Sequence, residues 1–450
     1  MPEAIWISFA FGLGLLTKAV GPPPLVGYLA AGFVLSGLAA SPSLGISAEP
    51  TAVLAHIAHL GVLLMLFTVG LKLKLKSVIS PEVIGGSLLH FAITCLVFTP
   101  GLYLILDITW YAAFMLAVAL SFSSTVLAAK VLENKRELRA FHGRVSIGIL
   151  IMQDLIALLV MSLAAGQTPS QWALIVFGLP LLRPLLFKLL DASGHDELLV
   201  LLGLLLALVL GGLGFETVGL SSELGALIFG AILANHPRSQ ELAKSLWSVK
   251  EIFLVGFFLQ IGIGGLPDTH AIIFAVVAAL VLPLKGILFF FLMLLFRLRA
   301  RSGFLTSLAL TNYSEFGLIV ASIALPEWLV PLAITVALSF LISAPLNRFA
   351  HPLYERLSHR LTPFESMRRH PDEQPVSLDD TRVLVMGMGR TGTSSYDWLK
   401  ATEPRLMALD SDPAKVAQHQ HEGRNVIFAD AEDNTFWESL HMPSLEAVIL

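Results

Sequence analysis

Long apolar stretches separated by short polar connections run along the chain from its first residues to residue 350. Most are close to the roughly 20 residues that a helix needs to cross the hydrocarbon core of a bilayer. The pattern therefore predicts an α-helical polytopic membrane protein with about 13 transmembrane helices. The expected spans are residues 4–19, 24–39, 53–71, 83–106, 109–130, 145–165, 171–190, 196–213, 219–234, 247–263, 271–297, 302–323 and 330–350.

Positive charges are confined to alternate connections between these spans. Basic residues lie in Lys72–Lys76 after the third span and in Arg297–Arg301 after the eleventh, whereas residues 40–52 and 264–270 contain none. Because cytoplasmic connections carry the excess of Lys and Arg, the pattern predicts an external N-terminus and a cytoplasmic C-terminal domain. Met1–Ala4 lack the basic region of a signal peptide, so we expect the first span to be retained in an inner (plasma) membrane.

The composition excludes an ordinary soluble protein. Hydrophobic residues make up 55% of the chain and charged residues 14%, and the mean hydropathy is +0.77. The lipid bilayer is therefore the expected partner, and no nucleic-acid partner is expected. Cys95 is the single cysteine, so no intramolecular disulfide can form. The histidine pairs His56 and His59, and His419 and His421, lack a third ligand nearby in the sequence, and no metal site is expected.

One acidic residue lies deep in the membrane. Asp154 is about ten residues into the sixth span and follows Gln153. A carboxylate at that depth costs at least about 2.5–3.5 kcal/mol and usually persists because it binds something. We expect Asp154 to hold a proton or a small cation in turn, with Gln153 as a second oxygen ligand. Such competition for one site couples two opposite fluxes, which predicts a secondary antiporter.

A few more ionisable residues are candidates for positions near mid-membrane depth, namely Lys285, Glu315 and Glu223. Lys285 is either a counter-ion of Asp154 that substrate releases, or the partner of Glu315. Glu315 is either an ion or proton ligand, or part of a structural network with Asn312–Ser314. Glu223 lies near the outer start of the ninth span, where a structural role is expected.

Two sequences predict broken helices. Residues 121–125 interrupt the fifth span with hydroxyls, and residues 260–265 interrupt the tenth with glycines. Breaks at mid-membrane expose backbone groups to ions in transporters built from inverted repeats. Ser123, Ser124 and Thr125 would supply further oxygen ligands. The alternative is a small-residue face for helix packing.

Composition changes after the last span. We expect a transmembrane domain over residues 1–351, a linker over 352–380 and a Rossmann-like domain over 381–450, incomplete because its fourth strand begins only at Glu446. A strand leads into the pattern GxGxxG at Gly387–Gly392, and an acid follows about 20 residues later, which is typical of nucleotide binding. The alternative is a Rossmann half with a purely structural role. The expected nucleotide-binding residues are Gly387, Met388, Gly389, Arg390, Thr391, Gly392, Asp410 and Asp430.

Two other functional classes fit less well. A channel would need a selectivity filter such as Thr-Val-Gly-Tyr-Gly, which the sequence lacks. An enzyme that uses the nucleotide as a redox cofactor would need a second catalytic group near the glycine loop, and none is seen. We therefore expect no enzymatic activity.

Several segments together resemble the Kef-type, glutathione-gated potassium:proton antiporters, over about residues 26–450. They are residues 60–67, 120–125, 149–155, 218–226 and 314–316. The Gln-Asp pair is specific, since sodium:proton relatives usually carry Asn-Asp or Asp-Asp. The resemblance implies a homodimer with a dimerisation domain, a six-helix core that moves as an elevator, and two crossed broken helices. It implies K⁺ efflux in exchange for H⁺, with Asp154 as the acid, Gln153 as its neighbour and Lys285 as the core lysine; Na⁺:H⁺ exchange is the alternative.

The same resemblance implies regulation by an RCK/KTN domain. It implies AMP or NAD(H) as the regulatory nucleotide, glutathione and its adducts as ligands with Arg390 in contact, and a flavodoxin-like oxidoreductase as an ancillary partner. One departure concerns the loop Arg238–Lys250, where Ser245 and Trp247 replace expected acids. We therefore expect the restraint that the regulatory domain exerts on transport to differ in this chain.

Overall fold

The structure is a computed structural model. It describes residues 2–20, 23–39, 52–72, 80–135, 137–138, 140–164, 178–179, 181–366, 370–373, 380–410, 413–429 and 444–449. The first part of the expected span at 171–190, and Asp430, lie outside these residues.

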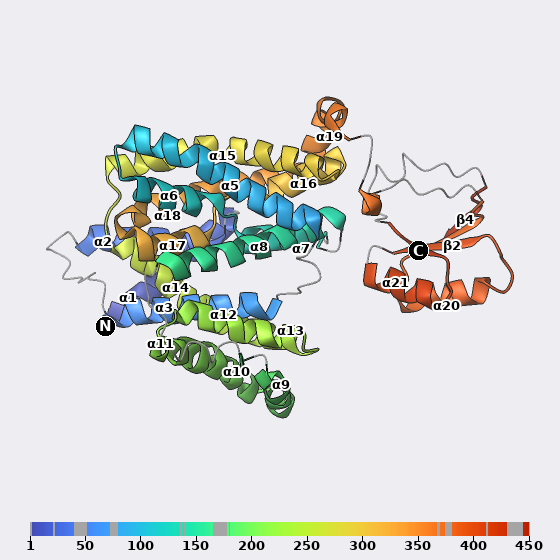
Figure 1. Ribbon diagram of the computed structural model, residues 1–450, viewed down its shortest axis with the longest axis horizontal. Helices are drawn as coiled ribbons and strands as arrows, with labels where there is room; N and C mark the ends of the chain where they lie inside the picture. Colours follow the sequence, from blue (N-terminus) through green and yellow to red (C-terminus); the bar gives the residue numbers. More distant parts are fainter. Residues whose placement is uncertain are drawn as a thin grey trace.

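Helices dominate the chain up to residue 361, as the apolar stretches predict (Figure 1). Proline begins α2 and α5, where the missing N–H is not needed. The helices of the first part are α1 (Pro2–Val20), α2 (Pro24–Ala39), α3 (Ala52–Lys72), α5 (Pro81–Leu106), α6 (Trp110–Ser121), α7 (Thr125–Asn134), α8 (Phe141–Ala164), α9 (Arg183–Ala192), α10 (Glu197–Leu204), the π-helix η3 (Leu205–Leu213) and α11 (Gly214–Thr217). The later ones are α12 (Ser222–Leu233), α13 (Ser239–Ser245), α14 (Trp247–Ile263), α15 (Thr269–Leu295), α16 (Ala300–Leu310), α17 (Glu315–Ala324), η4 (Pro326–Trp328), α18 (Leu329–Arg348) and α19 (Ala350–Leu361).

Many of these helices can cross a membrane. Within the described residues, seven are long and apolar enough, or eight if α13 and α14, which meet at a bend of 48°, form one span. Four shorter apolar helices accompany them. Each expected span that the structure describes coincides with one helix or with consecutive helices.

The first expected break is confirmed, and the second is wrong. The fifth span is interrupted between Ser121 and Thr125. The tenth span, α14, continues through Gln260 and ends at Ile263. A Cβ on Gly262 would lie 2.5 Å from the backbone oxygen of Leu29, so this glycine permits close packing of α14 on α2 rather than unwinding. The second break lies instead in the twelfth span, between α16 and α17.

The membrane helices form two bundles, seen in the upper and lower parts of Figure 1. The core bundle comprises α5–α8 and α15–α18. The scaffold bundle comprises α1–α3, α9–α14 and η3, and α14 lies beside the core. Glycine pairs hold the scaffold helices close: a Cβ on Gly70 would lie 2.4 Å from the Leu227 oxygen, and one on Gly230 would lie 2.2 Å from the Phe67 oxygen. The scaffold therefore has little room to rearrange internally.

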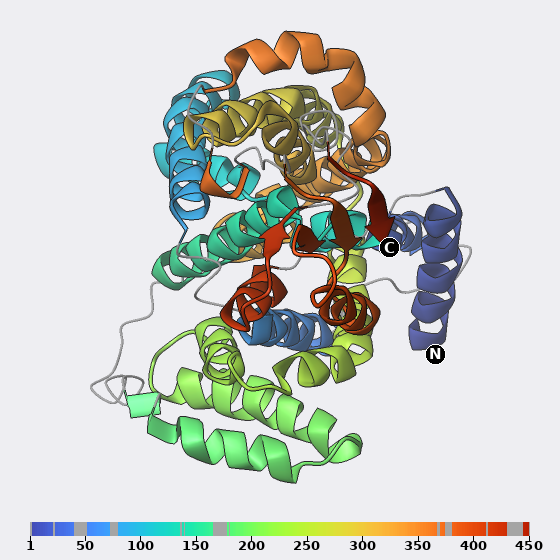
Figure 2. The same cartoon turned by 90° about the vertical axis from the view of Figure 1, so that its right-hand side faces the viewer.

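A small α/β domain follows the linker segments η5 (Thr362–Phe364) and η6 (Pro371–Glu373). Its parallel strands have the order β3-β2-β1-β4, which is half of a doubly wound sheet. The domain lies over one end of the helical bundle (Figure 2). Its elements are β1 (Val383–Met386), α20 (Arg390–Leu399), β2 (Leu406–Asp410), α21 (Pro413–His421), β3 (Val426–Phe428) and β4 (Ala447–Ile449).

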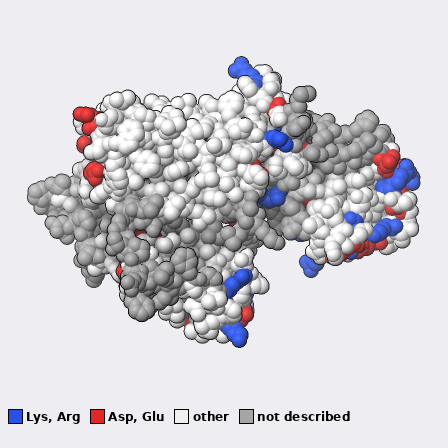
Figure 3. Space-filling model, in the orientation of Figure 1, with Lys and Arg blue, Asp and Glu red and all other residues white. Residues whose placement is uncertain are grey.

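Charged side chains avoid the middle of the helical bundle on the face shown in Figure 3. Lysine and arginine gather at the end that faces the C-terminal domain, and acidic side chains gather at the opposite end. An apolar belt between two charged ends is the surface expected of a membrane domain.

Candidate functional site

Two broken helices meet in the middle of the core bundle. The α6–α7 break contains Phe122–Ser124, and the α16–α17 break contains Thr311–Ser314. The hydroxyl of Ser124 accepts a hydrogen bond from the Leu127 N–H and so caps α7. The hydroxyl of Ser314 accepts one from the Phe316 N–H and caps α17 in the same way. A serine at each break therefore starts the second helix of the pair.

Hydrogen bonds join the two breaks directly. The Ser123 hydroxyl donates to the Leu310 carbonyl at 2.8 Å. The Ser124 N–H donates to Oδ1 of Asn312 at 2.6 Å. These bonds link residues almost 190 positions apart in the sequence and fix the point at which the broken helices cross.

Lys285 holds the same crossing from α15. Its ammonium donates to the carbonyls of Phe122 at 2.7 Å, Asn312 at 2.8 Å and Leu120 at 3.3 Å. These carbonyls lie at the C-terminal ends of α6 and α16 or just after them, where helices leave acceptors unpaired and carry partial negative charge. The expected pairing of Lys285 with Glu315 is wrong, because neither carboxylate oxygen of Glu315 has a hydrogen-bond partner among the described residues. The counter-ion role of Lys285 toward Asp154 stays a prediction.

Gln153 also supports the α6–α7 break. Its Oε1 accepts the Ser123 N–H at 2.9 Å, and its Nε2 lies 3.5 Å from the Ser121 oxygen. The side chain is 2% exposed. One lone pair of the amide oxygen is thus committed to the backbone, so positioning is the observed role and ion ligation stays a prediction.

Asp154, a residue of α8, lies beside the N-terminus of α7. It is 2% exposed, and its Oδ2 accepts a hydrogen bond from the Thr125 hydroxyl at 3.1 Å. Thr125 is the first residue of α7, so the partial positive charge of that helix terminus favours a negative group there. Of the three expected hydroxyl ligands, Thr125 contacts the acid, whereas Ser123 and Ser124 bond to the backbone.

Glu315 occupies the corresponding position at the start of α17. It is 4% exposed, and neither carboxylate oxygen has a hydrogen-bond partner among the described residues. The expected network with its sequence neighbours is not formed among the described residues. Asn312 accepts the Ser124 N–H, Tyr313 donates to the Ala278 carbonyl, and Ser314 caps α17. A buried acid without partners commonly marks a functional position.

The glycine loop of the C-terminal domain has the expected form. Gly387 has φ +88°, which favours glycine. A Cβ on Gly392 would lie 1.8 Å from the Gly387 oxygen, so the turn and α20 can pack only with glycine there. Gly389 and Arg390 are exposed at the start of α20, where helix amides can receive a phosphate.

Asp410 ends β2 beside this loop. Its Oδ2 accepts the Met388 N–H at 2.8 Å and lies 3.7 Å from Nζ of Lys415. His419 Nε2 lies 3.2 Å from the Met388 oxygen. The sequence did not indicate Lys415 or His419 as loop contacts, because both belong to α21, which the glycine pattern does not include.

A polar cluster connects the core bundle to the linker. Glu137, between α7 and α8, contacts His142 of α8 at 3.1 Å and also His351 of α19. Burial opposes ionisation of Glu137, but the hydrogen bonds from both histidines outweigh it and hold the pKa of that carboxyl far below its usual value. Arg144 of α8 lies over the Phe428 ring of β3, 5.1 Å from its centroid. The transport helices therefore touch both α19 and the α/β domain.

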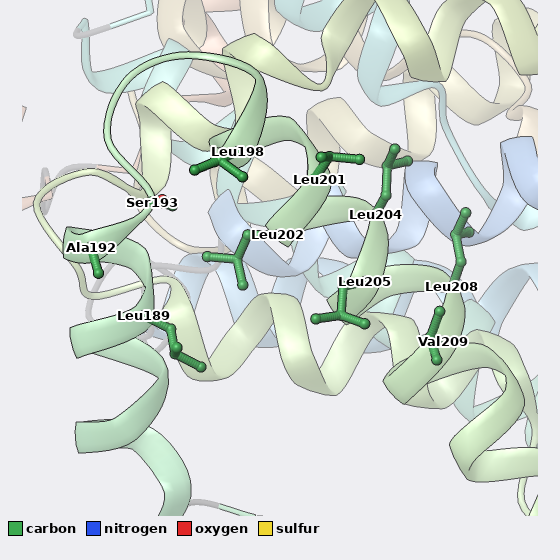
Figure 4. Close-up of a pocket in the computed structure, with 10 residues that line it drawn as sticks. All are labelled: Leu189, Ala192, Ser193, Leu198, Leu201, Leu202, Leu204, Leu205, Leu208 and Val209. Carbon is green, nitrogen blue, oxygen red and sulfur yellow. The ribbon is translucent and has the colours of Figure 1, made fainter.

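An apolar groove of about 610 Å³ lies along α9, α10 and η3, and leucine side chains line most of it (Figure 4). No ionisable side chain is among its described lining residues. Such a groove suits a lipid chain or an apolar helix rather than an ion. The described residues also contain no cluster suited to a metal ion.

Comparison with known proteins yields two family matches. The family described as "Sodium/hydrogen exchanger, transmembrane" matches residues 6–348, and the TrkA-N domain matches residues 383–450. Among solved structures, the sodium proton antiporter MjNhaP1 from Methanocaldococcus jannaschii is similar at a TM-score of 0.52 and 16% identity, covering 80% of this chain and 100% of that one. At that identity, the likeness shows the fold alone.

Proposed function

The chain belongs to the sodium/hydrogen exchanger family and carries a C-terminal TrkA-N domain, and we propose that it exports K⁺ in exchange for H⁺. It is a cation:proton antiporter with a TrkA-N regulatory domain, and the expected helical fold with a Rossmann-like C-terminal domain is confirmed. The Kef-type specificity and the choice of K⁺ belong to the proposal. The family is one of transporters, and we assign the chain no enzymatic reaction.

The buried carboxylate of Asp154 is the observation that carries this proposal. Asp154 belongs to α8, lies beside the N-terminus of α7 and accepts a hydrogen bond from Thr125. One negative group in a membrane interior holds one proton or one cation, but not both at once. Exchange is coupled if the carrier reorients only when Asp154 is neutralised by one of them.

The groups around Asp154 suit a weakly hydrated cation. The Thr125 hydroxyl and backbone carbonyls near the α6–α7 break are oxygen ligands of the kind that replace the hydration shell of K⁺. Lys285 donates to the carbonyls at the ends of α6 and α16 and so offsets their partial negative charge beside the site.

Movement of the core bundle against the scaffold bundle would give alternating access. In support, Val126 and Glu315 of the core line one cavity with residues of α2 and α14, so the two bundles meet directly beside the broken helices. A homodimer formed through the scaffold would keep that bundle fixed while the core moves as an elevator.

The TrkA-N domain would gate transport from the cytoplasm. We propose AMP or NAD(H) at Gly387–Gly392 with Asp410 near the ribose, and glutathione near Arg390. Asp430 would complete the site as expected from the sequence. The contacts of Glu137 with His351 and of Arg144 with Phe428 offer a path from the domain to α8, the helix of Asp154. A flavodoxin-like ancillary partner stays a prediction.

Sodium is the second candidate cation. The family description and the similar solved structure both name sodium and protons. The amide of Gln153, in place of an acid or Asn, supports K⁺ on the resemblance already described.

Flux measurements in proteoliposomes test the proposal. We expect K⁺ and Rb⁺ to dissipate a preset pH gradient more strongly than Na⁺ and Li⁺, and Asp154→Asn to abolish this while the protein stays folded. Asp107→Asn is the matched control, since Asp107 is exposed at the end of α5. A response to Na⁺ alone would replace K⁺ with Na⁺, and full exchange by Asp154→Asn would remove the carrier assignment.

A further inference from the structure

A small cavity lies where the core bundle meets the scaffold bundle. Its volume is about 30 Å³. The core contributes Val126 of α7 and Glu315 of α17, and the scaffold contributes Tyr28 of α2 and Glu251 of α14, with apolar neighbours. A space of this size accommodates about one water molecule or one ion without its hydration shell.

Glu315 is the group in this cavity that lacks a partner. Both of its carboxylate oxygens are buried without a hydrogen-bond partner among the described residues. A charged carboxylate in that state is unstable unless a proton or a cation neutralises it. Because the side chain lines the cavity, the missing partner can be a guest of the cavity itself.

Two charged groups of α14 set the charge of that guest. Glu251 lines the cavity with Glu315, and Lys250 pairs with Glu251 at 2.8 Å. The Lys250 side chain is 10% exposed and that of Glu251 is 37% exposed. Two carboxylates and one ammonium leave a net charge of one negative unit at the cavity, and a single monovalent cation or a single proton balances it.

We propose that this cavity is a second binding site of the antiporter, for one dehydrated monovalent cation that competes with a proton, with Glu315 and Glu251 as the ligating carboxylates. The inference rests on the proposed function and extends it beyond Asp154. Lys250 tunes the site by pairing with Glu251. Since Glu251 is partly exposed, it is also the point at which a cation from solution first meets the site.

The site depends on the position of the core bundle. Glu315 belongs to the core and Glu251 to the scaffold, so a displacement of one bundle along the other separates the two carboxylates. An occupied site therefore stabilises the arrangement seen here. Its affinity should fall when the core moves, which would release the cation without any further trigger.

Charge variants of Lys250 and Glu251 test the proposal, because the site requires opposite effects from them. Glu251→Gln leaves the Lys250 charge to neutralise Glu315 and should weaken apparent K⁺ or Na⁺ affinity about tenfold or more. Lys250→Gln adds net negative charge and should strengthen that affinity by a similar factor. The double variant restores one negative unit and should return near wild type.

Two measurements separate failure of this site from failure of the proposed function. The first is the cation concentration for half-maximal dissipation of a pH gradient in proteoliposomes. The second is the increase in melting temperature of the purified protein on titration with K⁺, Rb⁺ or Na⁺, which needs no transport. Glu223→Gln is the matched control, since Glu223 is a scaffold carboxylate that does not line the cavity.

The second site is supported if Lys250→Gln and Glu251→Gln shift both measurements in opposite directions, the double variant returns near wild type, and Glu223→Gln causes no shift. Shifts of the same sign in Lys250→Gln and Glu251→Gln indicate a packing role and overturn it, as does no shift in either. Opposite melting shifts in a protein that exchanges no cation support the site and reject the antiport function. Glu315→Gln should reduce the cation-dependent melting increase to the part that Asp154 contributes, and an undiminished increase overturns the proposal.

Discussion

Replacement of Lys285 by methionine tests the observed role of that lysine most directly. The variant keeps an unbranched side chain of similar length but removes the ammonium. Three buried carbonyls, those of Leu120, Phe122 and Asn312, then lose their donor. A buried polar group left unsatisfied costs about 1–3 kcal/mol, so the loss should total roughly 3–9 kcal/mol. That is comparable to the whole stability of many proteins, about 5–15 kcal/mol.

The assay is thermal unfolding of the purified protein in detergent, followed by intrinsic fluorescence. We expect a large decrease in melting temperature for Lys285→Met. Lys130→Met is the matched control, because Lys130 is an exposed lysine of α7 in the same bundle. The control should melt close to wild type.

A double variant distinguishes this role from a counter-ion role. If Lys285 neutralised Asp154, Asp154→Asn would remove the unpaired charge and recover stability lost in Lys285→Met. The geometry predicts no recovery, since the lysine serves the carbonyls of α6 and α16. Recovery in the double variant, or a melting temperature for Lys285→Met equal to that of the Lys130 control, would refute the reasoning.

Four further predictions follow from single contacts. Thr125→Val removes the hydrogen bond to Asp154 and one oxygen beside it, so the cation concentration for half-maximal exchange should rise about two- to tenfold. Gly32→Val places a Cβ 2.6 Å from a backbone oxygen of α14 and should destabilise the protein by about 1–3 kcal/mol or more in thermal unfolding. The low pKa of Glu137 in the folded protein contributes stability that is fully present above the usual carboxyl pKa and is lost as the pH falls toward the lowered pKa. Limited proteolysis of the linker in the wild-type protein should therefore become faster in acid. In Glu137→Gln, proteolysis should be faster than in the wild type at every pH above that range. Arg390→Ala should weaken the effect of nucleotide or glutathione on cation flux without changing basal flux. An unchanged effect of both ligands would show that Arg390 does not contact them.

The sequence alone predicted the features that depend on local pattern. Apolar length placed the membrane spans, because a helix in lipid must satisfy its own backbone and be long enough to cross. The hydroxyl-rich break at residues 121–125 and the glycine loop at Gly387–Gly392 could be predicted because each depends on residue types at adjacent positions. Asp154 stood out because an acid in an apolar span is costly.

Tertiary structure decided which distant groups meet. The glycines of residues 260–265 predicted an unwound helix, yet Gly262 packs on α2, and only the position of a neighbouring helix distinguishes these uses. The partners of Lys285 are carbonyls from two breaks about 190 residues apart, and local sequence carries no signal of that crossing. No local pattern marks Glu251, near the start of the tenth span, as a site residue. Its carboxylate shares a cavity with Glu315 only because α14 packs against the core bundle. Hydropathy and spacing indicate whether each segment is more stable in lipid or in water. The free energy of a buried charge depends instead on the atoms that long-range packing brings around it.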